Sequence, residues 1–185
     1  MTVDYICREV ERLKRKFHET DPFKLCDAMG IILLYAPMGT YPGACKGFFL
    51  AQSRKRSITV NSDLPEAIQR IIVTHELGHA VLHAKAVGVN AFHDFELFDS
   101  TSFMEYEANI FAAEFLMDDD DVLEKLNEDI SFFGAASLLR VPPELLDFKF
   151  RLMKWKGYKL IEPPISARSN FLRDMEVPDN ADYYS

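Results

Sequence analysis

The sequence predicts an α+β fold in which a small antiparallel sheet lies among helices. Apolar residues recur at every third or fourth position over residues 3–19, a spacing typical of an amphipathic helix. Short apolar runs between residues 31 and 61 are separated by turn-rich or charged segments, which indicates strands. Two longer apolar segments, 62–86 and 102–117, have the length and composition of buried helices.

The composition is that of an ordinary soluble domain and excludes several classes of protein. The 185 residues are 48% hydrophobic and 27% charged, which is sufficient for a core without disulfides. The net charge of −8 argues against direct nucleic-acid binding over the whole surface. The three cysteines, Cys7, Cys26 and Cys45, form no CxxC pair and indicate reduced thiols. No stretch reaches the roughly 18 apolar residues of a membrane span. We therefore expect a cytoplasmic protein without a membrane partner.

The first third of the chain is expected to pass from helix to sheet. Asp21 and Pro22 begin a second helix, which Gly30 ends. The run "IILLYAP" that follows reads as a strand, and the turn-rich "YPGACKG" comes after it. The runs "FFLAQ" and "SITVN" flank the charged tip "SRKR", which predicts a hairpin.

The central helix is expected to begin in "NSDLPEAIQR". Asp63 or Ser62 is the predicted N-cap, with Pro65 in the first turn. Glu66 lies near the positive end of the helix dipole, where a carboxylate is favoured. The helix then continues to about Ala86.

The second half of the chain is predicted to be helical as far as residue 160. A loop over residues 87–102 leads into the helix "SFMEYEANIFAAEFLM". The aspartates at 118–121 are expected to begin the next helix, because acidic groups favour a helix N-terminus. Two or three short helices follow, with a break at Val141 and Pro142. Residues 161–185 show little periodicity and predict an extended or disordered tail.

The segment "IIVTHELGHAVLHA" contains three histidines and a glutamate in an otherwise apolar run. On a helix, His75 and His79 lie ~40° apart around the axis and ~6 Å apart along it. Both imidazoles can then reach one cation at ~2.0–2.1 Å. Glu76 is displaced by ~100°, too far to be a third ligand but beside the position where water would bind. This is the H-E-x-x-H arrangement of zinc peptidases.

Burial supports the same interpretation. Glu76 is the only formally charged side chain from Ile71 to Ala84, and ionisable groups in an apolar helix are costly unless paired. A dication would pair with both imidazoles and offset the carboxylate. The alternative is a pair of histidines that are hydrogen-bonded inside a core without metal.

A catalytic zinc ion usually has three protein ligands and one exchangeable position. In "MEYEANIFAAEFLM", Glu107 and Glu114 fall within ~20° of each other and mark a predicted solvent face. Glu105 lies almost opposite, on an apolar stripe that includes Asn109. We therefore predict Glu105 as the third ligand and expect Asn109 to support a ligand by a hydrogen bond.

Two further histidines and one glycine lie near this site in the sequence. His83 is ~12 Å along the axis from His75, so the two cannot share a metal ion. His83 is either a helix-end histidine with its own hydrogen bonds or a contact to a ligand or the substrate. His93, in the loop between the two helices, could stabilise charge in the transition state. Gly78 costs a helix about 1 kcal/mol relative to alanine, so another element is expected to pack closely there.

The stretch "ITVNSDLPEAIQRIIVTHELGHAVLH", followed by "EYEANIFAAEFLM", resembles the ImmA/IrrE family of metallopeptidases over roughly residues 25–120. The resemblance implies that His75, His79 and Glu105 are zinc ligands and that Glu76 is the catalytic glutamate. It also implies a gluzincin-like fold, with the sheet packed on the active-site helices. Members of the family cleave repressors of the helix-turn-helix type. One departure is "FLMD" before the aspartates, where the family often has "LLMP".

The motifs predict a zinc-dependent endopeptidase, and the family resemblance implies that its substrate is a helix-turn-helix repressor. The expected parts are a metallopeptidase domain (1–118), a helix-turn-helix-like subdomain (119–160) and the tail (161–185). The alternative is a non-proteolytic regulator or a DNA- or protein-binding module with a structural or sensory metal site. Residues 140–159 contain six basic and two acidic residues. That stretch could be a helical subdomain with solvated lysines, a docking surface for the substrate or a DNA contact.

Overall fold

The computed structural model describes residues 1–52, 55–83, 100–127 and 130–175. Two helices open the chain, α1 (Val3–Phe17) and α2 (Pro22–Ala28). The Asp21 side chain caps α2 by accepting a hydrogen bond from the backbone N–H of Phe23 at 2.9 Å, as predicted. The apolar stripe of α1 is buried against the rest of the protein. Both predicted N-terminal helices are therefore confirmed.

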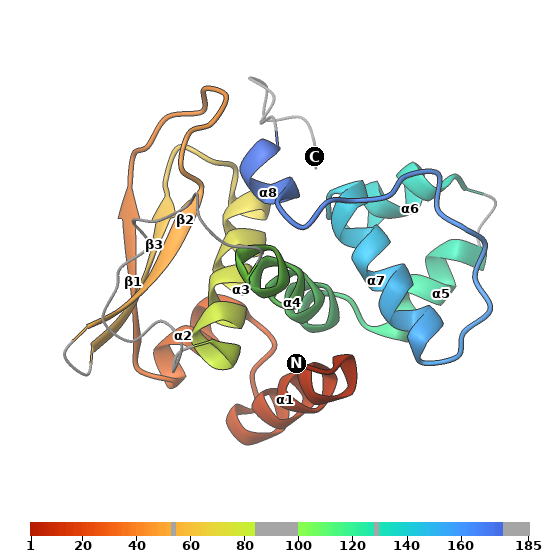
Figure 1. Cartoon of the computed structure of the whole chain (residues 1–185), viewed down its shortest axis with the longest axis horizontal. Helices are drawn as coiled ribbons and strands as arrows, with labels where there is room; N and C mark the ends of the chain where they lie inside the picture. The colour runs from red at the N-terminus through yellow and green to blue at the C-terminus, as the bar shows by residue number, and fades with distance from the viewer. Residues whose placement is uncertain (53–54, 84–99, 128–129, 176–185) are drawn as a thin grey trace.

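The three strands form one sheet in the order β1-β3-β2 (Figure 1). Their bounds are β1 Ile31–Ala36, β2 Gly47–Gln52 and β3 Lys55–Asn61. The hairpin β2–β3 is antiparallel and places Phe49 opposite Ile58, whereas β1 is parallel to β3. The predicted α+β class is confirmed, but the sheet is mixed and not purely antiparallel. The reason is that β3 inserts between β1 and β2, which are joined by the connection 37–46.

Helix α3 (Glu66–Leu82) begins differently from the prediction. Its N-cap is Pro65, which offers no side-chain hydrogen bond, and neither Asp63 nor Ser62 serves as the cap. The Asp63 carboxylate instead accepts a hydrogen bond from the backbone N–H of Gly39 at 2.7 Å. Asp63 therefore fixes the loop after β1. The helix ends at its C-cap His83, and the predicted continuation to Ala86 lies outside the described residues.

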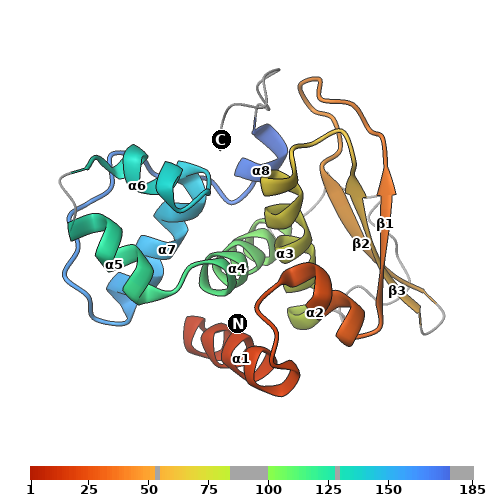
Figure 2. The same ribbon diagram turned by 180° about the vertical axis from the view of Figure 1, so that it is seen from behind.

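Helix α4 (Ser100–Leu116) packs against α3 with very little space between them. A Cβ atom on Gly78 would lie 3.2 Å from both the Cα of Ala108 and the Cβ of Phe111. Glycine lets the two backbones approach, which confirms the predicted close packing at this position. Figures 1 and 2 both show α4 between α3 and α7, with the sheet beyond α3 and α1 below α4. The two helices that contain the candidate ligands are thus held at the centre of the protein.

The remaining helices are α5 (Asp119–Asn127), α6 (Phe132–Leu138), α7 (Pro143–Trp155) and the short α8 (Phe171–Asp174). The predicted break at Val141 and Pro142 separates α6 from α7, and Pro142 is the N-cap of α7. Helices α5 to α7 lie on the side of α4 away from the sheet (Figure 1). Among the described residues, no helix is long and apolar enough to span a membrane.

The locally basic stretch 140–159 does not present its charges to solvent as a group. Lys149, which is 1% exposed, pairs with Glu114 at 2.8 Å and with Asp119 at 2.7 Å. Lys156 pairs with the same two carboxylates. Two further basic residues also have acidic partners, Arg151 with Asp147 and Lys154 with Glu162. The pairs of Lys149, Arg151 and Lys156 lie within the helical region, whereas the partner of Lys154, Glu162, lies beyond α7 and is exposed. The pairing weakens the case for a DNA-binding face.

Candidate metal centre and cleft

Three predicted ligands meet between α3 and α4. The Nε2 atom of His75 lies 3.1 Å from Oε2 of Glu105, and Nε2 of His79 lies 3.3 Å from Oε1. The two Nε2 atoms are 3.1 Å apart. Both histidines are buried, at 4% and 2% exposure. Local helix geometry brings the imidazoles together because they are one turn apart, and the packing of α3 on α4 adds the carboxylate.

A hydrogen-bonded chain leads from this cluster to the end of α3. Nδ1 of His79 lies 3.1 Å from Nδ1 of His83, and Nε2 of His83 lies 2.8 Å from Oε2 of Glu107. The other carboxylate oxygen of Glu107 contacts the Met1 ammonium group. Glu107 is only 9% exposed, so its predicted place on a solvent face is wrong. The helical wheel gives only the direction of Glu107 around the helix axis. Its carboxylate can be buried because His83, at the end of α3, is its hydrogen-bond partner.

The chain of contacts assigns the tautomers of both histidines. Burial and the proximity of His79 together lower the pKa of His83 to about 4, so His83 is neutral near pH 7. The Glu107 carboxylate can only accept, so Nε2 of His83 donates to it. The Nδ1 atom of His83 must then accept from Nδ1–H of His79. In neutral His79 this leaves the Nε2 lone pair directed at His75 and Glu105.

The donor set fits a divalent cation. Three donors that hold zinc tetrahedrally at ~2.0–2.1 Å are separated by about 3.3 Å, close to the spacings of 3.1–3.3 Å found here. Two imidazole nitrogens and a carboxylate are ligands that zinc commonly takes. Burial alone would raise the pKa of Glu105, but hydrogen bonds with His75 and His79 outweigh it and hold this pKa below its usual range. Glu105 is therefore ionised, as a ligand must be.

Glu76 lies beside the three donors but is not one of them. The pKa of its carboxyl is raised to about 7, because burial, with a smaller contribution from Glu105, outweighs the lowering by His79 and by the backbone N–H of Phe49. Lys46 and Asn61 are opposite each other and hydrogen-bonded, since the N–H of Asn61 donates to the carbonyl of Lys46. Hydrogen-bonded and non-hydrogen-bonded pairs alternate along an antiparallel ladder, so Phe49 and Ile58, three positions further on, form a pair that is not hydrogen-bonded. The N–H of Phe49 thus points away from β3 and reaches Glu76. The free edge of β2 therefore borders the site.

The candidate metal centre opens into a cleft of about 820 Å³. One wall is the start of β2 with the loop before it, residues 43–48, and a second is formed by α3 and α4. Residues from 167 to 173 form a third wall. Glu76 and Met104 line the cleft together with the three donors. A peptide chain could reach both the donors and the Glu76 carboxylate from this space.

Comparison with known proteins bears on this geometry. The model of the IrrE N-terminal-like domain, a peptidase family, matches residues 26–151. The chain belongs to this family. An uncharacterized immunity region protein 2 from Bacillus phage phi105 is 31% identical over 140 residues, which cover 76% of this chain and 85% of that protein. The resemblance inferred from the motifs is confirmed. The three donors lie within the part of the chain that matches this metallopeptidase family.

Asn109 takes a different partner from the one expected in an IrrE-like site. Its Nδ2 donates a hydrogen bond to the backbone carbonyl of Ser169 at 2.6 Å, which joins α4 to the C-terminal segment. Its Oδ1 is buried and, like Nδ1 of His75, has no hydrogen-bond partner among the described residues. Support of a ligand by Asn109 stays a prediction. His93 lies outside the residues that the structure describes.

Sequence reasoning missed two groups of residues in this IrrE-like protein. The cleft walls at residues 43–48 and 167–173 carry no motif and no periodicity. Glu107 was considered only as an exposed helper, although it lies directly before Ala108 and four residues before Phe111, the two residues of α4 that contact Gly78. A signal was available in the sequence: apolar residues lie on nearly every side of the helix "SFMEYEANIFAAEFLM", which leaves little room for a solvent face.

Proposed function

We propose that the protein is a zinc-dependent endopeptidase that cleaves a helix-turn-helix repressor. In this proposal His75, His79 and Glu105 hold the zinc ion and Glu76 is the general base. The observation that carries it is the convergence of three donors, at spacings suited to one cation, on a cleft that Glu76 also lines. Membership of a peptidase family supports hydrolysis of a peptide bond.

The residues of the cleft have separate tasks in the proposed reaction. A zinc ion at this site would supply Lewis acidity toward the scissile carbonyl and would lower the pKa of a water. The Glu76 carboxylate takes a proton from the attacking water and passes it to the leaving amine. Burial raises the pKa of this carboxyl, and a nearby dication would lower it and keep the base ionised.

His83 and Glu107 have a positioning task in this proposal. The chain from Glu107 through His83 fixes which nitrogen of His79 carries a proton, so Nε2 keeps its lone pair for the metal. Such a carboxylate–histidine support raises the basicity of a ligand and holds its ring orientation. These side chains are buried and do not line the cleft, which is consistent with an indirect role.

A repressor is the substrate that the family resemblance favours. The phage phi105 relative is described as an immunity region protein, a context in which removal of a repressor would have an effect. The cleft is large enough for an extended peptide segment, not only for a single side chain. The internally paired charges of α7 favour a peptidase over a DNA-binding regulator.

The test pairs the purified protein with helix-turn-helix repressors encoded beside its gene. Each repressor is incubated with the zinc-loaded protein, with and without a chelator, and the products are read by mass spectrometry. We expect one defined cleavage that the chelator abolishes and added zinc restores. Cleavage that persists after the metal has been removed and verified absent by elemental analysis would contradict a metal-dependent peptidase.

A further inference from the structure

The C-terminal segment from residue 167 to residue 173, here called the strap, forms a wall of the same cleft that holds the candidate metal centre. It lies beyond residues 26–151, the part of the chain that the family model matches. Figures 1 and 2 show its helix α8 beside α3, between the sheet and α7. A segment remote in sequence from the H-E-x-x-H motif thus borders the space where a substrate would lie.

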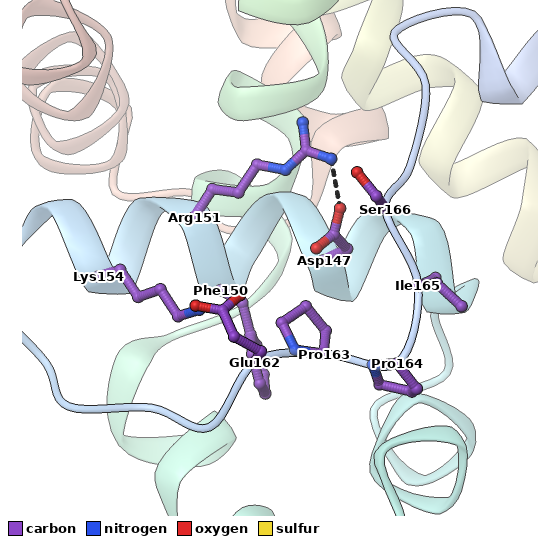
Figure 3. Close-up of a pocket in the computed structure, with 9 residues that line it drawn as sticks. All are labelled: Asp147, Phe150, Arg151, Lys154, Glu162, Pro163, Pro164, Ile165 and Ser166. Carbon is purple, nitrogen blue, oxygen red and sulfur yellow. Dashed lines mark hydrogen bonds and ion pairs between the residues drawn. The ribbon is translucent and has the colours of Figure 1, made fainter.

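Two side chains of α7 hold the backbone of the strap. Oδ2 of Asp147 accepts a hydrogen bond from the N–H of Ala167 at 2.9 Å, and Nη2 of Arg151 donates to the carbonyl of Ala167 at 2.7 Å. Arg151 and Asp147 also pair with each other, beside a smaller cavity of about 420 Å³ (Figure 3). Because Asp147 is only 3% exposed, its hydrogen bond with Ala167 is sheltered from water and helps to hold one position of the backbone.

Two further contacts fix the strap nearer the cleft. Asn109 holds the carbonyl of Ser169, as described above. Phe171 and Leu172 are 7% and 6% exposed, and the ring centroid of Phe171 lies 5.8 Å from that of Phe148 on α7. The strap is therefore a packed wall whose backbone has a defined shape.

The strap presents positive charge to the cleft. Arg168 and Arg173 both line it. Arg168 is exposed and forms no ion pair with a carboxylate among the described residues, and Arg173 pairs with its neighbour Asp174 at the surface, where the two side chains are 61% and 52% exposed. Lys46 adds a third cation from the opposite wall, with its ammonium bonded to the carbonyl of Ala44.

Among the described residues that line the cleft, the acidic side chains all lie at the candidate metal centre. Its acidic members are Glu76 and Glu105, and a dication would offset both. A cleft with a basic rim is therefore set into a chain whose net charge is −8. In such a concave site the local charge, and not the total, decides which ligand is attracted.

We propose that the strap selects the substrate, and that Arg168 and Arg173 bind acidic side chains of the protein segment that enters the cleft. This inference rests on the proposed function for the cleavage step only. Guanidinium groups bind carboxylates through two parallel hydrogen bonds, which favours acidic over neutral side chains of similar shape. The strap thereby supplies a preference that the family-matched part of the chain does not contain.

The test measures binding without catalysis. The probes are a fluorescent peptide with several glutamates and a matched copy with glutamines, titrated by anisotropy with the full-length Glu76→Gln protein. The variant is Arg168→Glu with Arg173→Glu. The matched control is Arg8→Glu with Arg15→Glu on α1, which changes the net charge equally and lies outside the cleft lining. Unfolding midpoints check that all proteins are folded.

We expect the acidic peptide to bind at least about tenfold more tightly than the glutamine copy, and the strap variant to lose that difference while the α1 control keeps it. Equal binding of both peptides by the parent protein, or equal loss in strap and control variants, would overturn the proposal. Displacement of the acidic peptide by a random-sequence DNA duplex that binds more tightly would assign the strap to nucleic acid instead. Since no cleavage is measured, a failed hydrolysis assay leaves this result unaffected.

Discussion

The Nδ1 atoms of His79 and His83 lie 3.1 Å apart, which makes one imidazole the hydrogen-bond donor and the other the acceptor. Glu107 decides the order, because it accepts from the far nitrogen of His83 at 2.8 Å. His83, the third histidine of "HELGHAVLH", lies too far along the helix to share a metal ion with His75. It nevertheless sets the tautomer of His79, a residue that can bind the metal.

Replacement of His83 by phenylalanine is expected to weaken zinc affinity about 10–100-fold, the usual effect of removing a residue that supports a ligand. The ring volume is kept, but His79 loses its acceptor and its tautomer is no longer fixed. Competition with a chromogenic chelator measures the affinity. Full occupancy should still be reached at high zinc, and an affinity equal to that of the parent would exclude the positioning role.

The two glutamates of α4 should differ in their effect on the metal. Glu105→Ala removes a candidate ligand and should abolish stable zinc binding, whereas Glu107→Ala should reduce affinity by no more than the His83 substitution, since it acts through His83. Elemental analysis after dialysis measures both. Equal zinc loss in the two variants would show that the ligand assignment is wrong.

Glu76→Gln is expected to keep the metal and to lose cleavage by roughly 10²–10⁴-fold, the range that a general base contributes. Glutamine preserves the shape and the hydrogen bond from Phe49 but cannot take a proton from water. Zinc content and the rate of repressor cleavage are measured on the same preparation. A variant that cuts at the parent rate would show that another group is the base.

Gly78→Ala should separate the two ligand-bearing helices. The added Cβ would lie 3.2 Å from backbone and side-chain atoms of α4 that have no flexible end to move away. We expect a loss of stability of about 1–3 kcal/mol, typical of overpacking. Gly134→Ala on α6 is the control, because its nearest contact would be Ser131 Oγ at 3.4 Å. Urea unfolding should show no loss for that variant.

The charges that join α4, α5 and α7 should make stability depend on pH in acid. Burial raises the pKa of Asp119, but hydrogen bonds from Lys149 and Lys156 outweigh it and leave this pKa below its ordinary value of 3.8. The unfolded chain then takes up the proton first, so Asp119 stabilises the fold above pH 3.8 and this contribution is lost as the pH falls through the folded-state pKa.

The variant Asp119→Asn tests this dependence. Its free energy of unfolding should be below that of the parent at neutral pH, and the difference should shrink as the pH falls below 3.8. Urea titrations at a series of pH values give both curves. If the free energies of unfolding of the two proteins differ by the same amount over the whole acid range, the Asp119 carboxylate does not make stability depend on pH.

The parts of the site that the sequence predicted depend on geometry within single helices. His75, Glu76 and His79 follow from helical spacing, and Glu105 follows from its angle on α4. The prediction that Glu107 is exposed was wrong because the angle of a residue around its own helix gives no information about a partner on another helix. The parallel pairing of β1 with β3 and the position of the strap depend on contacts between distant segments. Residues 161–175 lack periodicity, so their packing leaves no pattern in the sequence.

The anchoring of Ser169 by Asn109 bears on how far the protein can be shortened. A chain cut at the family boundary of residue 151 would lose Phe171 and Leu172, uncover the Phe148 ring and leave the Asn109 amide facing solvent. The smallest unit that keeps these packing contacts is consequently longer than the shared domain. Expression designs and engineered fusions should preserve the chain through Met175.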